Sequence, residues 1–511
     1  MARQEVIRKV RRGGGTLPRS AAKRARGRQP EEAALLEESP TELTEAERAS
    51  GATAPAVDIR NLPVCIREVV LAAQDTDPGP PEPTDYHQLR GRLEAARATL
   101  PPLYRDAVLV PYLRTLDRIG PQGFADALVR DPQRDAEAGL LMDAAHAILQ
   151  NGEGYQRIAT DAFEEVVSDL YDGFLSAEDR RGVHPPDQGT LAPLVKWGNP
   201  DFGPYTWPVD ATFSVLGMEC GVVSLPPSQG RAGLLAWAAL GHEVGGHDIL
   251  HADTGLAEEL STVVYDRLQK QGLSALANYW ARRIDETASD VLGILNMGPA
   301  AGIGIIGYFR GLDAAFGGPG RLRNVGGSSD PHPADIVRGY LAGSAVKRLR
   351  FSQAEAWSQA IFDEVDKDLD PAELRLGSQR VTPEQARMSA DLVADAIMTH
   401  RAKALEGQSL AWIQNWRNQD EQRVRQLRRR LATGVGNLTE KLETGTYAAH
   451  VVAAGVVAGL AEQADVRKIF DRMVRMLKQM HDRNPAWGPL FVRHRGDVVP
   501  HFIYPFPARR A

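Results

Sequence analysis

Cysteine is scarce in this chain: only Cys65 and Cys220 occur among its 511 residues. Two thiols cannot build the disulfide framework that holds small secreted domains together. The chain is long enough to bury a sizeable core without cross-links, and 43% of its residues are hydrophobic. We therefore expect a protein of a reducing compartment, the cytoplasm, whose fold depends on packing.

Long uninterrupted apolar segments are also missing. The stretch Val291–Phe309 carries no charge, but Asn296, Pro299 and five glycines interrupt it. It therefore predicts a buried, kinked pair of helices rather than a membrane span. Near the start of the chain, Arg11-Arg12 is followed by three glycines instead of an apolar core. We expect no secretory signal and no contact with a membrane.

Neither sign of charge dominates, since 60 basic residues face 66 acidic ones and the net charge is −6. This balance argues against general binding of nucleic acid. Locally the signs separate: residues 1–30 carry ten Lys or Arg and one acid, and residues 31–48 carry seven Glu and one Arg. Without apolar periodicity, residues 1–57 are predicted to form a disordered basic and acidic tail. The alternative is a basic arm that touches nucleic acid or an acidic partner.

Beyond this tail the apolar residues recur mostly at spacings of three and four, which predicts helices. The fold class is therefore mainly α with a small β-sheet (α+β). We expect a helical N-terminal region at residues 58–182, a central core at 183–350 and a helical C-terminal region at 351–511. The segment 183–230 is rich in proline, glycine and tryptophan, which is typical of a cleft wall. Within it, the residues Gly221–Leu225 are predicted to form a short edge strand that ends at Pro226-Pro227.

Metal-ligand chemistry is concentrated in one stretch, Leu240–Asp253, at the end of an apolar helical run. It contains three histidines and three acids, which are His242, Glu243, His247, Asp248, His251 and Asp253. A helix with His-Glu followed by a second His is typical of zinc hydrolases. The two imidazoles bind the ion, and the adjacent Glu deprotonates the water bound to it. The stretch therefore predicts a zinc site.

The spacing of these histidines is unusual. In the common form, H-E-x-x-H, they stand at i and i+4, about 40° apart around a helix. His242 and His247 stand at i and i+5, about 140° apart, so a regular helix cannot bring both to one ion. A π-type bulge at Gly245-Gly246 would correct this, and glycine is the residue at which a backbone distortion is easiest. We expect such a bulge.

The pattern H-E-x-x-G-H, here His242–His247, resembles the zinc motif of the dipeptidyl peptidase III family. That family has a second motif, E-E-C-R-A-[ED], on a later helix. Asp285–Asp290 is similar to it, although Asp replaces the first Glu, Thr replaces Cys, and Ala-Ser replaces Arg-Ala. The resemblance implies that Glu286 is the third zinc ligand and that Asp285 and Asp290 orient the histidines. It also implies a zincin-like catalytic core between flanking helical regions, and a strand before the motif that offers its edge to a peptide.

Glu286 is expected on a helix that runs from Leu273 to about Met297. Further along the chain, His332 stands between two prolines and could stabilise the oxyanion of a tetrahedral intermediate. Tyr340 is a second candidate for this role, and Arg338 and Tyr340 are candidates for binding a carboxylate or carbonyl of the substrate. No spacing rule assigns any of these roles.

A rival set of ligands lies in the same stretch. Glu243, His247 and His251 stand at i, i+4 and i+8 and share one face of a regular helix. Two histidines and a carboxylate can hold iron or another divalent metal, as in an oxidoreductase. A third possibility is a structural or binding protein with a closed or vestigial site, in which His251 or Asp253 replaces the water.

The sequence thus predicts a zinc-dependent metallopeptidase that acts on peptides. His242, His247 and Glu286 hold Zn²⁺, and Glu243 activates the water and then protonates the leaving amine. The nature of the peptide is left open.

Overall fold

The computed structural model describes residues 57–77, 79–81, 83–129, 136–175, 180–181, 183–184, 186–187, 191–200, 203–434 and 445–483. The tail predicted at residues 1–57 lies outside them apart from its last residue, and so do residues 484–511. All described residues belong to one compact unit, Ala54–Ala511. This unit is mainly helical with two three-stranded sheets, so the predicted fold class is confirmed.

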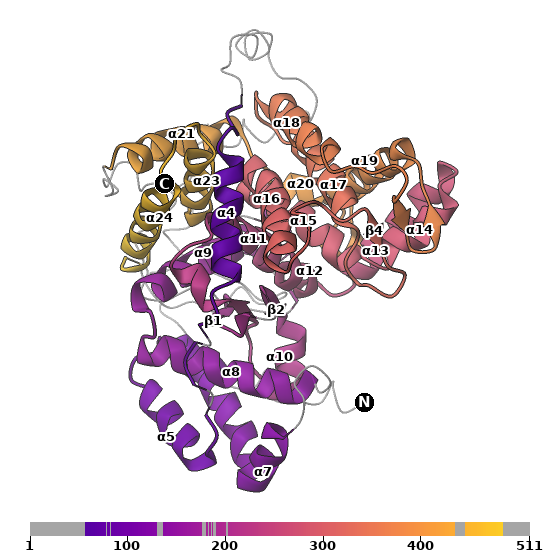
Figure 1. The fold of residues 1–511 in the computed structure, drawn as a ribbon. Coiled ribbons are helices and arrows are strands. Elements are labelled where there is room, and N and C mark those ends of the chain that lie inside the picture. Colours follow the sequence, from indigo (N-terminus) through magenta and orange to yellow (C-terminus); the bar gives the residue numbers. More distant parts are fainter. Residues whose placement is uncertain are drawn as a thin grey trace, which may run out of the picture. The chain divides into compact units, whose positions relative to one another are not determined.

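The first part of the unit is helical. Its elements are α4 (Leu62–Ala73), α5 (Tyr86–Ala96), α6 (Pro102–Tyr104), η2 (Arg105–Leu109), α7 (Val110–Leu128), α8 (Ala136–Glu153) and α9 (Arg157–Leu175). Helices α5, α7 and α8 lie together at one end of this unit (Figure 1). Their apolar faces bury residues such as Leu93, Leu116 and Ile148 in a hydrophobic core of their own.

A small sheet separates this core from the main one. It consists of β1 (Leu194–Trp197), β2 (Tyr205–Trp207) and β3 (Val222–Leu225) in the order β1-β3-β2. Successive side chains of a strand point to opposite faces. Accordingly, Leu194 and Val222 belong to the core of the N-terminal helices, whereas Val195 and Val223 belong to the main core. The sheet is thus a wall shared by both cores.

The predicted strand at Gly221–Leu225 is present as β3, but it is not an edge strand. It pairs in parallel with β1 and antiparallel with β2, so both of its edges are occupied. The edge strand is β2, which lies in the segment that the sequence indicated only as a cleft wall. Long-range pairing places β3 at the centre of the sheet, and local sequence does not encode that pairing.

The rest of the unit is built on helices around the metal motif. In order these are η4 (Pro227–Gly230), α11 (Leu234–His242), η5 (Glu243–Asp248), α12 (Ile249–Ala252), α13 (Leu256–Lys270), α14 (Ser274–Ala281), α15 (Ile284–Met297), α16 (Pro299–Ala315) and α17 (Asp335–Lys347), with α10 (Val209–Leu216) before β3. The remaining helices are α18 (Ala354–Asp366), α19 (Pro383–Thr399), η6 (Lys403–Leu405), α20 (Leu410–Ile413), α21 (Asn418–Thr433), α23 (Ala448–Gly459) and α24 (Val466–His481). The second sheet is formed by β4 (Val325–Gly326), β5 (Arg375–Leu376) and β6 (Gln379–Arg380).

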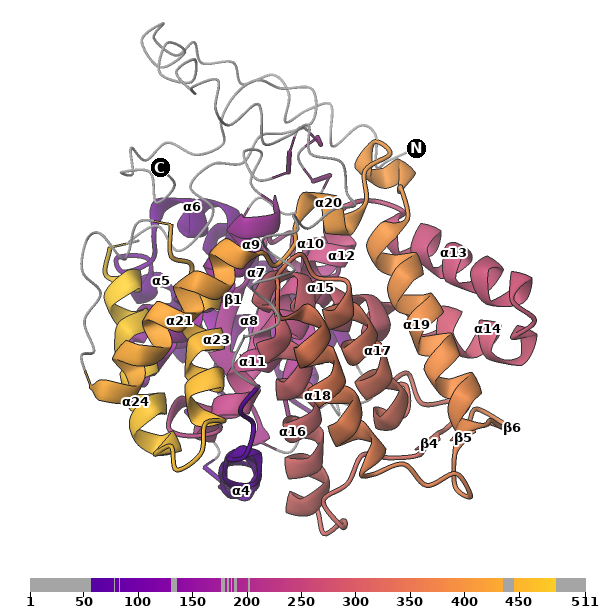
Figure 2. The ribbon, with the colours of Figure 1, turned by 90° about the horizontal axis from the view of Figure 1, so that it is seen from above.

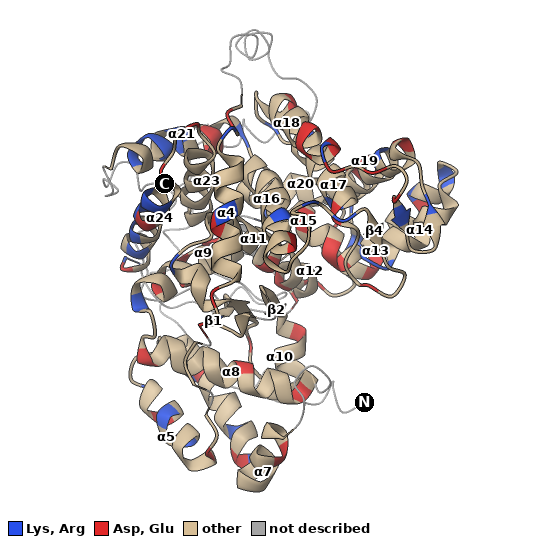
Figure 3. Cartoon of the chain, in the orientation of Figure 1, with Lys and Arg blue, Asp and Glu red and all other residues tan. Residues whose placement is uncertain are grey.

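The distribution of charged residues differs between the outer and the inner helices. Lys and Arg gather on the outer helices α21 and α24, whereas α11 and α23 carry no charged residue apart from the motif histidine and His450 (Figure 3). Viewed from above, α15 and α16 lie between the α13/α14/α19 group and the α21/α23/α24 group (Figure 2). The metal motif therefore begins in the interior of the unit.

The motif helix contains the predicted bulge. Helix α11 ends at His242, a π-helical segment spans Glu243–Asp248, and α12 then resumes α-helical geometry. A π-type turn adds one residue to the helical repeat, which is the correction that the i, i+5 spacing requires. Both glycines of the motif lie inside the bulge. The extra residue between the two histidines and the bulge that accommodates it therefore occur at the same place.

Glycine also sets how closely the motif helix approaches α15. A Cβ at Gly246 would stand 2.0 Å from the Cβ of Ser289, and a Cβ at Gly293 would stand 2.8 Å from the carbonyl carbon of Gly241. Real Cβ atoms do not approach so closely, so the two backbones touch at these two points. Glu286 lies one turn before Ser289 on α15. The contact therefore fixes the position of the predicted third ligand relative to the histidines.

Two further predictions concern α15. The helix expected from Leu273 to Met297 is divided into α14 and α15, because Arg283 leaves helical geometry (φ −114°, ψ 25°) and donates to the carbonyl of Tyr279. The uncharged stretch Val291–Phe309 forms the end of α15 and much of α16, with a break at Gly298, as predicted. In the described part of the chain, no helix has both the length and the hydropathy needed to cross a bilayer.

Gly246→Ala tests the contact between the motif helix and α15. The added methyl group would stand 2.0 Å from the Cβ of Ser289, far inside van der Waals contact, so the substitution should lower the free energy of unfolding by about 1–3 kcal/mol or more. Urea denaturation measures this. Gly91→Ala in α5 is the matched control, because no atom lies within 4 Å of its Cβ position; it should be neutral or stabilise by up to about 1 kcal/mol. Equal midpoints for both variants would contradict the close contact.

Candidate metal centre

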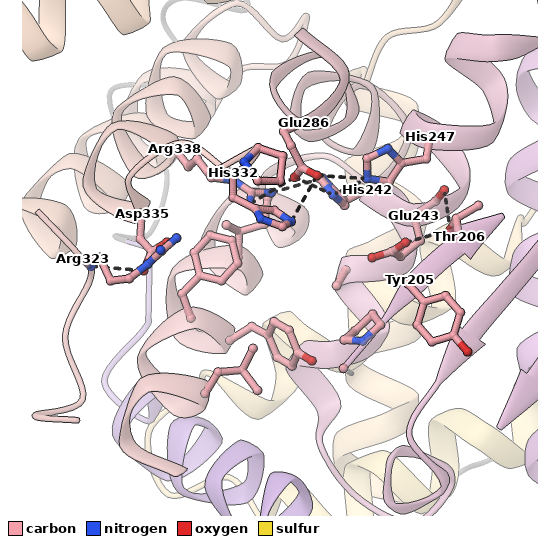
Figure 4. A pocket seen from close by; sticks show the side chains of 18 of the residues that line it. Tyr205, Thr206, His242, Glu243, His247, Glu286, Arg323, His332, Asp335 and Arg338 are labelled. Carbon is pink, nitrogen blue, oxygen red and sulfur yellow. Dashed lines mark hydrogen bonds and ion pairs between the residues drawn. The ribbon is translucent and has the colours of Figure 1, made fainter. Parts of the chain in front are cut away.

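The motif opens onto a cavity of about 870 Å³. Four elements supply its walls: the motif helix (His242, Glu243, His247), the start of α15 (Asp285, Glu286), one face of α16, and the edge strand β2 (Tyr205, Thr206). The loop before α17 adds His332, and α17 itself adds Arg338. Figure 4 shows His242, Glu243, His247, Glu286 and His332 gathered around a common space. The cavity has the size of a small-molecule or peptide site.

Three side chains form a group that could hold a metal ion. The Nε2 atoms of His242 and His247 lie 3.1 Å apart. The carboxylate oxygens of Glu286 lie 3.5 Å from the first Nε2 and 3.6 Å from the second. Two ligands about 2.05 Å from a tetrahedral zinc ion are about 3.3 Å apart. Within the described residues, this is the one group of three or more His, Cys, Asp or Glu whose ligand atoms come together in this way.

The hydrogen bonds of the imidazoles favour a bound cation. The Nδ1–H of His242 donates to Asp290 (2.8 Å), and the Nδ1–H of His247 donates to Asp285 (3.1 Å). These tautomers leave two Nε2 lone pairs facing each other, which cannot form a hydrogen bond. Either a metal ion or a proton has to lie between them. The carboxylates that fix the tautomers are Asp285 and Asp290, the residues to which the resemblance gives this role.

Charge around Glu286 keeps it ionised. Burial raises the pKa of Glu286, but the positive charge of Arg338 and of the nearby histidines lowers it by more, so that the net shift is downward. The guanidinium of Arg338 lies 3.4 Å from Glu286 Oε2 and donates twice to Asp290 at 2.8 Å. Glu286 Oε2 is buried and has no hydrogen-bond partner in the described part of the chain. The donor set of two imidazoles and one carboxylate, with an unbonded oxygen aimed inward, fits Zn²⁺.

Glu243 lies next to these ligands and is held in place. Its carboxylate accepts a hydrogen bond of 2.7 Å from the Thr206 hydroxyl, which also contacts the Glu243 carbonyl oxygen at 3.2 Å. The edge strand β2 therefore orients the residue that follows the first ligand (Figure 4). Sequence reasoning did not identify Thr206, because its role depends on the pairing of β2 with β3.

The structure brings His332 to the site but not Tyr340. The Nε2 of His332 lies 3.4 Å from Glu286 Oε1, and its Nδ1 faces Asp330 at 3.2 Å. Tyr340 is buried elsewhere: its hydroxyl donates to Asp366, and it does not line the cavity. Two other tyrosines line the cavity, Tyr205 of β2 and Tyr308 of α16. Arg338, expected to bind substrate, is instead engaged by Asp290 and Glu286.

The rival set of ligands does not converge. His251 directs its Nε2 to Asp285 at 2.9 Å and its Nδ1 toward Asp210 at 3.7 Å. Because the bulge rotates the chain after Glu243, the regular i, i+4, i+8 face does not exist here. Asp253, the other candidate for a fourth ligand, forms a buried ion pair with Arg180. Neither side chain closes the group formed by His242, His247 and Glu286.

Comparison of the chain with models of protein families, with curated proteins and with solved structures finds no match. The assignment of a metal ion to this cavity therefore depends on the side chains themselves. The structure brings together His242, His247 and Glu286, the three residues that the sequence predicted as ligands.

Zinc content provides the most direct test of the centre. Purified protein should contain close to one zinc ion per chain, measured by elemental mass spectrometry. His242→Ala and Glu286→Ala should lose it, because each removes a ligand, whereas His251→Ala should retain it. Asp290→Asn should bind zinc about 10–100-fold more weakly, because it no longer holds the His242 tautomer. Zinc loss in His251→Ala with retention in His242→Ala would contradict this ligand set.

Zinc binding should also be pH-dependent. Burial lowers the pKa of His247, but its hydrogen bond to Asp285 and the charges of Glu243 and Glu286 raise it to about 9. Without metal, His247 is therefore protonated at pH 7 and can donate from Nε2 to His242, and zinc must displace this proton. The apparent affinity for zinc should rise up to tenfold per pH unit from about pH 6.5 to about 9, because fewer protons compete.

The stability of the metal-free chain should change in the opposite direction. The folded pKa of His247 lies above the unfolded value of about 6.5, so the stability that protonated His247 contributes is complete below pH 6.5 and is lost as the pH rises through 9.

Calorimetric titration with zinc, in buffers of different ionisation enthalpy, measures the proton that zinc binding releases. An affinity that does not change between pH 6.5 and 8 would contradict this protonation state.

Proposed function

We propose that this protein is a zinc-dependent metallopeptidase. The observation that carries the proposal is the meeting of His242, His247 and Glu286 across a π-bulge, with the Glu243 carboxylate held beside them in an open cavity. A purely structural zinc site is closed by four protein ligands. Here the described residues supply three, and the remaining side faces a space of about 870 Å³. The resemblance of both motifs to the dipeptidyl peptidase III family supports the same function.

Glu243 acts as the base in this proposal. When bound, the zinc ion would polarise a peptide carbonyl and lower the pKa of water in the cavity. Glu243 takes one proton from the water molecule that adds to the carbonyl carbon. It then gives this proton to the amine nitrogen as the C–N bond breaks. Thr206 holds the carboxylate in one orientation through this transfer, by its hydrogen bond to Glu243 Oε2.

Two other groups would act on the substrate or on the ligands. His332 lies at the mouth of the centre with its Nδ1 facing Asp330. When the ring carries both protons, Nδ1–H donates to Asp330 and Nε2–H is available to the oxyanion that forms on the carbonyl oxygen. Arg338 is a positioning residue, because its guanidinium contacts Glu286 and Asp290 rather than the cavity centre. Its charge also offsets the acids that surround the ion.

The edge strand β2 provides a surface for a peptide. It is the outer strand of the order β1-β3-β2, and Tyr205 and Thr206 line the cavity. An extended peptide can add to such an edge through backbone hydrogen bonds alone. In this proposal the role that the sequence suggested for β3 belongs to β2. We also propose that the protein acts in the cytoplasm, where its two free thiols, Cys65 and Cys220, would stay reduced.

Glu243→Gln separates catalysis from metal binding. The amide keeps the size of the side chain but cannot accept the proton of water, so hydrolysis of a quenched fluorescent peptide library should fall about 10²–10⁴-fold. Zinc content should remain at the wild-type level. Glu258→Gln, an exposed residue on α13, is the matched control and should keep full activity. Hydrolysis that persists in Glu243→Gln, or a zinc-loaded wild type that cleaves no peptide, would reject the proposal.

A further inference from the structure

One wall of the cavity is apolar and is formed by a single helix face. Ile305, Phe309 and Leu312 of α16 line the cavity together with Phe316, the residue that follows the helix. Their spacings of four, three and four residues place them on one side of an α-helix. From the first to the last, the wall extends about 16 Å along the helix axis. This is the length of several residues of an extended peptide.

The wall begins beside the metal centre and ends in solvent. Ile305 is buried, Phe309 and Leu312 are half-buried, and Phe316 is 70% exposed. The Phe309 ring lies 4.6 Å from the guanidinium carbon of Arg338, which in turn contacts Glu286. The apolar surface is therefore continuous with the site of chemistry. Exposed apolar surface at the rim of a cavity is typical of a place where a ligand binds.

Phe316 is held in this exposed position by the end of the helix. The backbone N–H of Gly318 donates to the Asp313 carbonyl (2.8 Å), and that of Gly317 donates to the Ala314 carbonyl (3.2 Å), which is the hydrogen-bond pattern of a Schellman turn. The Asp313 carboxylate also accepts from the N–H groups of Gly320 and Arg321. The ring is thus presented by an ordered turn, and little conformational freedom is lost when a ligand covers it.

The same helix contributes one polar atom to the wall. Tyr308 lines the cavity and is only 4% exposed, and its hydroxyl has no hydrogen-bond partner in the part of the chain that the structure describes. Burial and the Glu243 carboxylate both raise the pKa of Tyr308, so the hydroxyl keeps its proton at neutral pH. A buried donor of this kind is costly unless a ligand accepts its hydrogen bond. Peptide carbonyl oxygens are suitable acceptors.

We infer that the α16 wall is the specificity subsite of the proposed peptidase, and that it selects peptides with a bulky apolar side chain within a few residues of the scissile bond. The side chain packs on Phe309, Leu312 and Phe316, and the Tyr308 hydroxyl donates to a backbone carbonyl of the same peptide. This inference rests on the proposed function for the identity of the ligand as a peptide. It adds the class of residue that the peptide carries.

Peptide binding to a variant that cannot turn over tests this inference. Full-length, zinc-loaded Glu243→Gln is titrated calorimetrically with N-acetyl-Ala-Phe-Ala-amide and with N-acetyl-Ala-Ala-Ala-amide. The Phe peptide should bind about tenfold or more tightly, because its ring is removed from water against the wall. Phe316→Ser in this background should reduce the preference at least threefold, and Phe316→Ser/Leu312→Ser should reduce it further. Phe213→Ser, which removes an exposed ring from α10 outside the cavity, should leave it unchanged.

Tyr308→Phe isolates the hydroxyl. It should weaken the binding of both peptides to the same extent and keep the preference for the Phe peptide. The thermal midpoint should stay at or above that of the parent, because a buried unbonded group is removed. Equal binding of the two peptides by the parent, or a preference that survives in both serine variants, would overturn the inference. Preference for the Phe peptide without any cleavage by wild type would reject the peptidase and leave the subsite standing.

Discussion

The candidate centre depends on one backbone contact, between the motif helix and α15. Gly246 faces Ser289 and Gly293 faces Gly241, and neither Gly246 nor Gly293 has room for a side chain. Only at this separation can Glu286 reach the Nε2 atoms of His242 and His247. The π-bulge turns the histidines to one side, and the close approach of the helices brings the carboxylate to them. The centre is therefore a product of packing as much as of ligand identity.

Electrostatic balance is the second constraint on this region. Four carboxylates lie close together, those of Glu243, Asp285, Glu286 and Asp290. Arg338 is buried among them and donates to both oxygens of Asp290, whose Oδ1 also accepts from His242. The two oxygens of Asp285 accept from His247 and His251. Removing one partner of such a buried pair typically leaves an uncompensated charge that is strongly destabilising. In the proposed centre, a divalent ion held by His242, His247 and Glu286 would add further positive charge among these carboxylates.

Sequence reasoning succeeded where a local pattern has a direct geometric consequence. The helical class, the strand at β3 and the bulge at Gly245-Gly246 all follow from spacing and residue type. It failed where the rotation of a helix or the pairing of a strand decides which side chains meet. Helices α16 and α17 are buried on nearly every side, so their sequences show no polar face that would reveal which tyrosine meets the cavity. Thr206 depends on strand pairing, and the break at Arg283 depends on tertiary hydrogen bonds.

The sheet that separates the two cores has a consequence for how this protein folds and tolerates truncation. Val222 packs on the N-terminal helices, and its neighbour Val223 packs on the main core, so neither core is complete without the same three strands. Strand β2 also holds Glu243 through Thr206. The N-terminal helices are therefore not a detachable module. Cutting them away would uncover one side of the sheet, and any opening that frays β2 would break the hydrogen bond between Thr206 and Glu243. Unfolding of this sheet and loss of the geometry of the candidate centre should therefore share one cooperative transition.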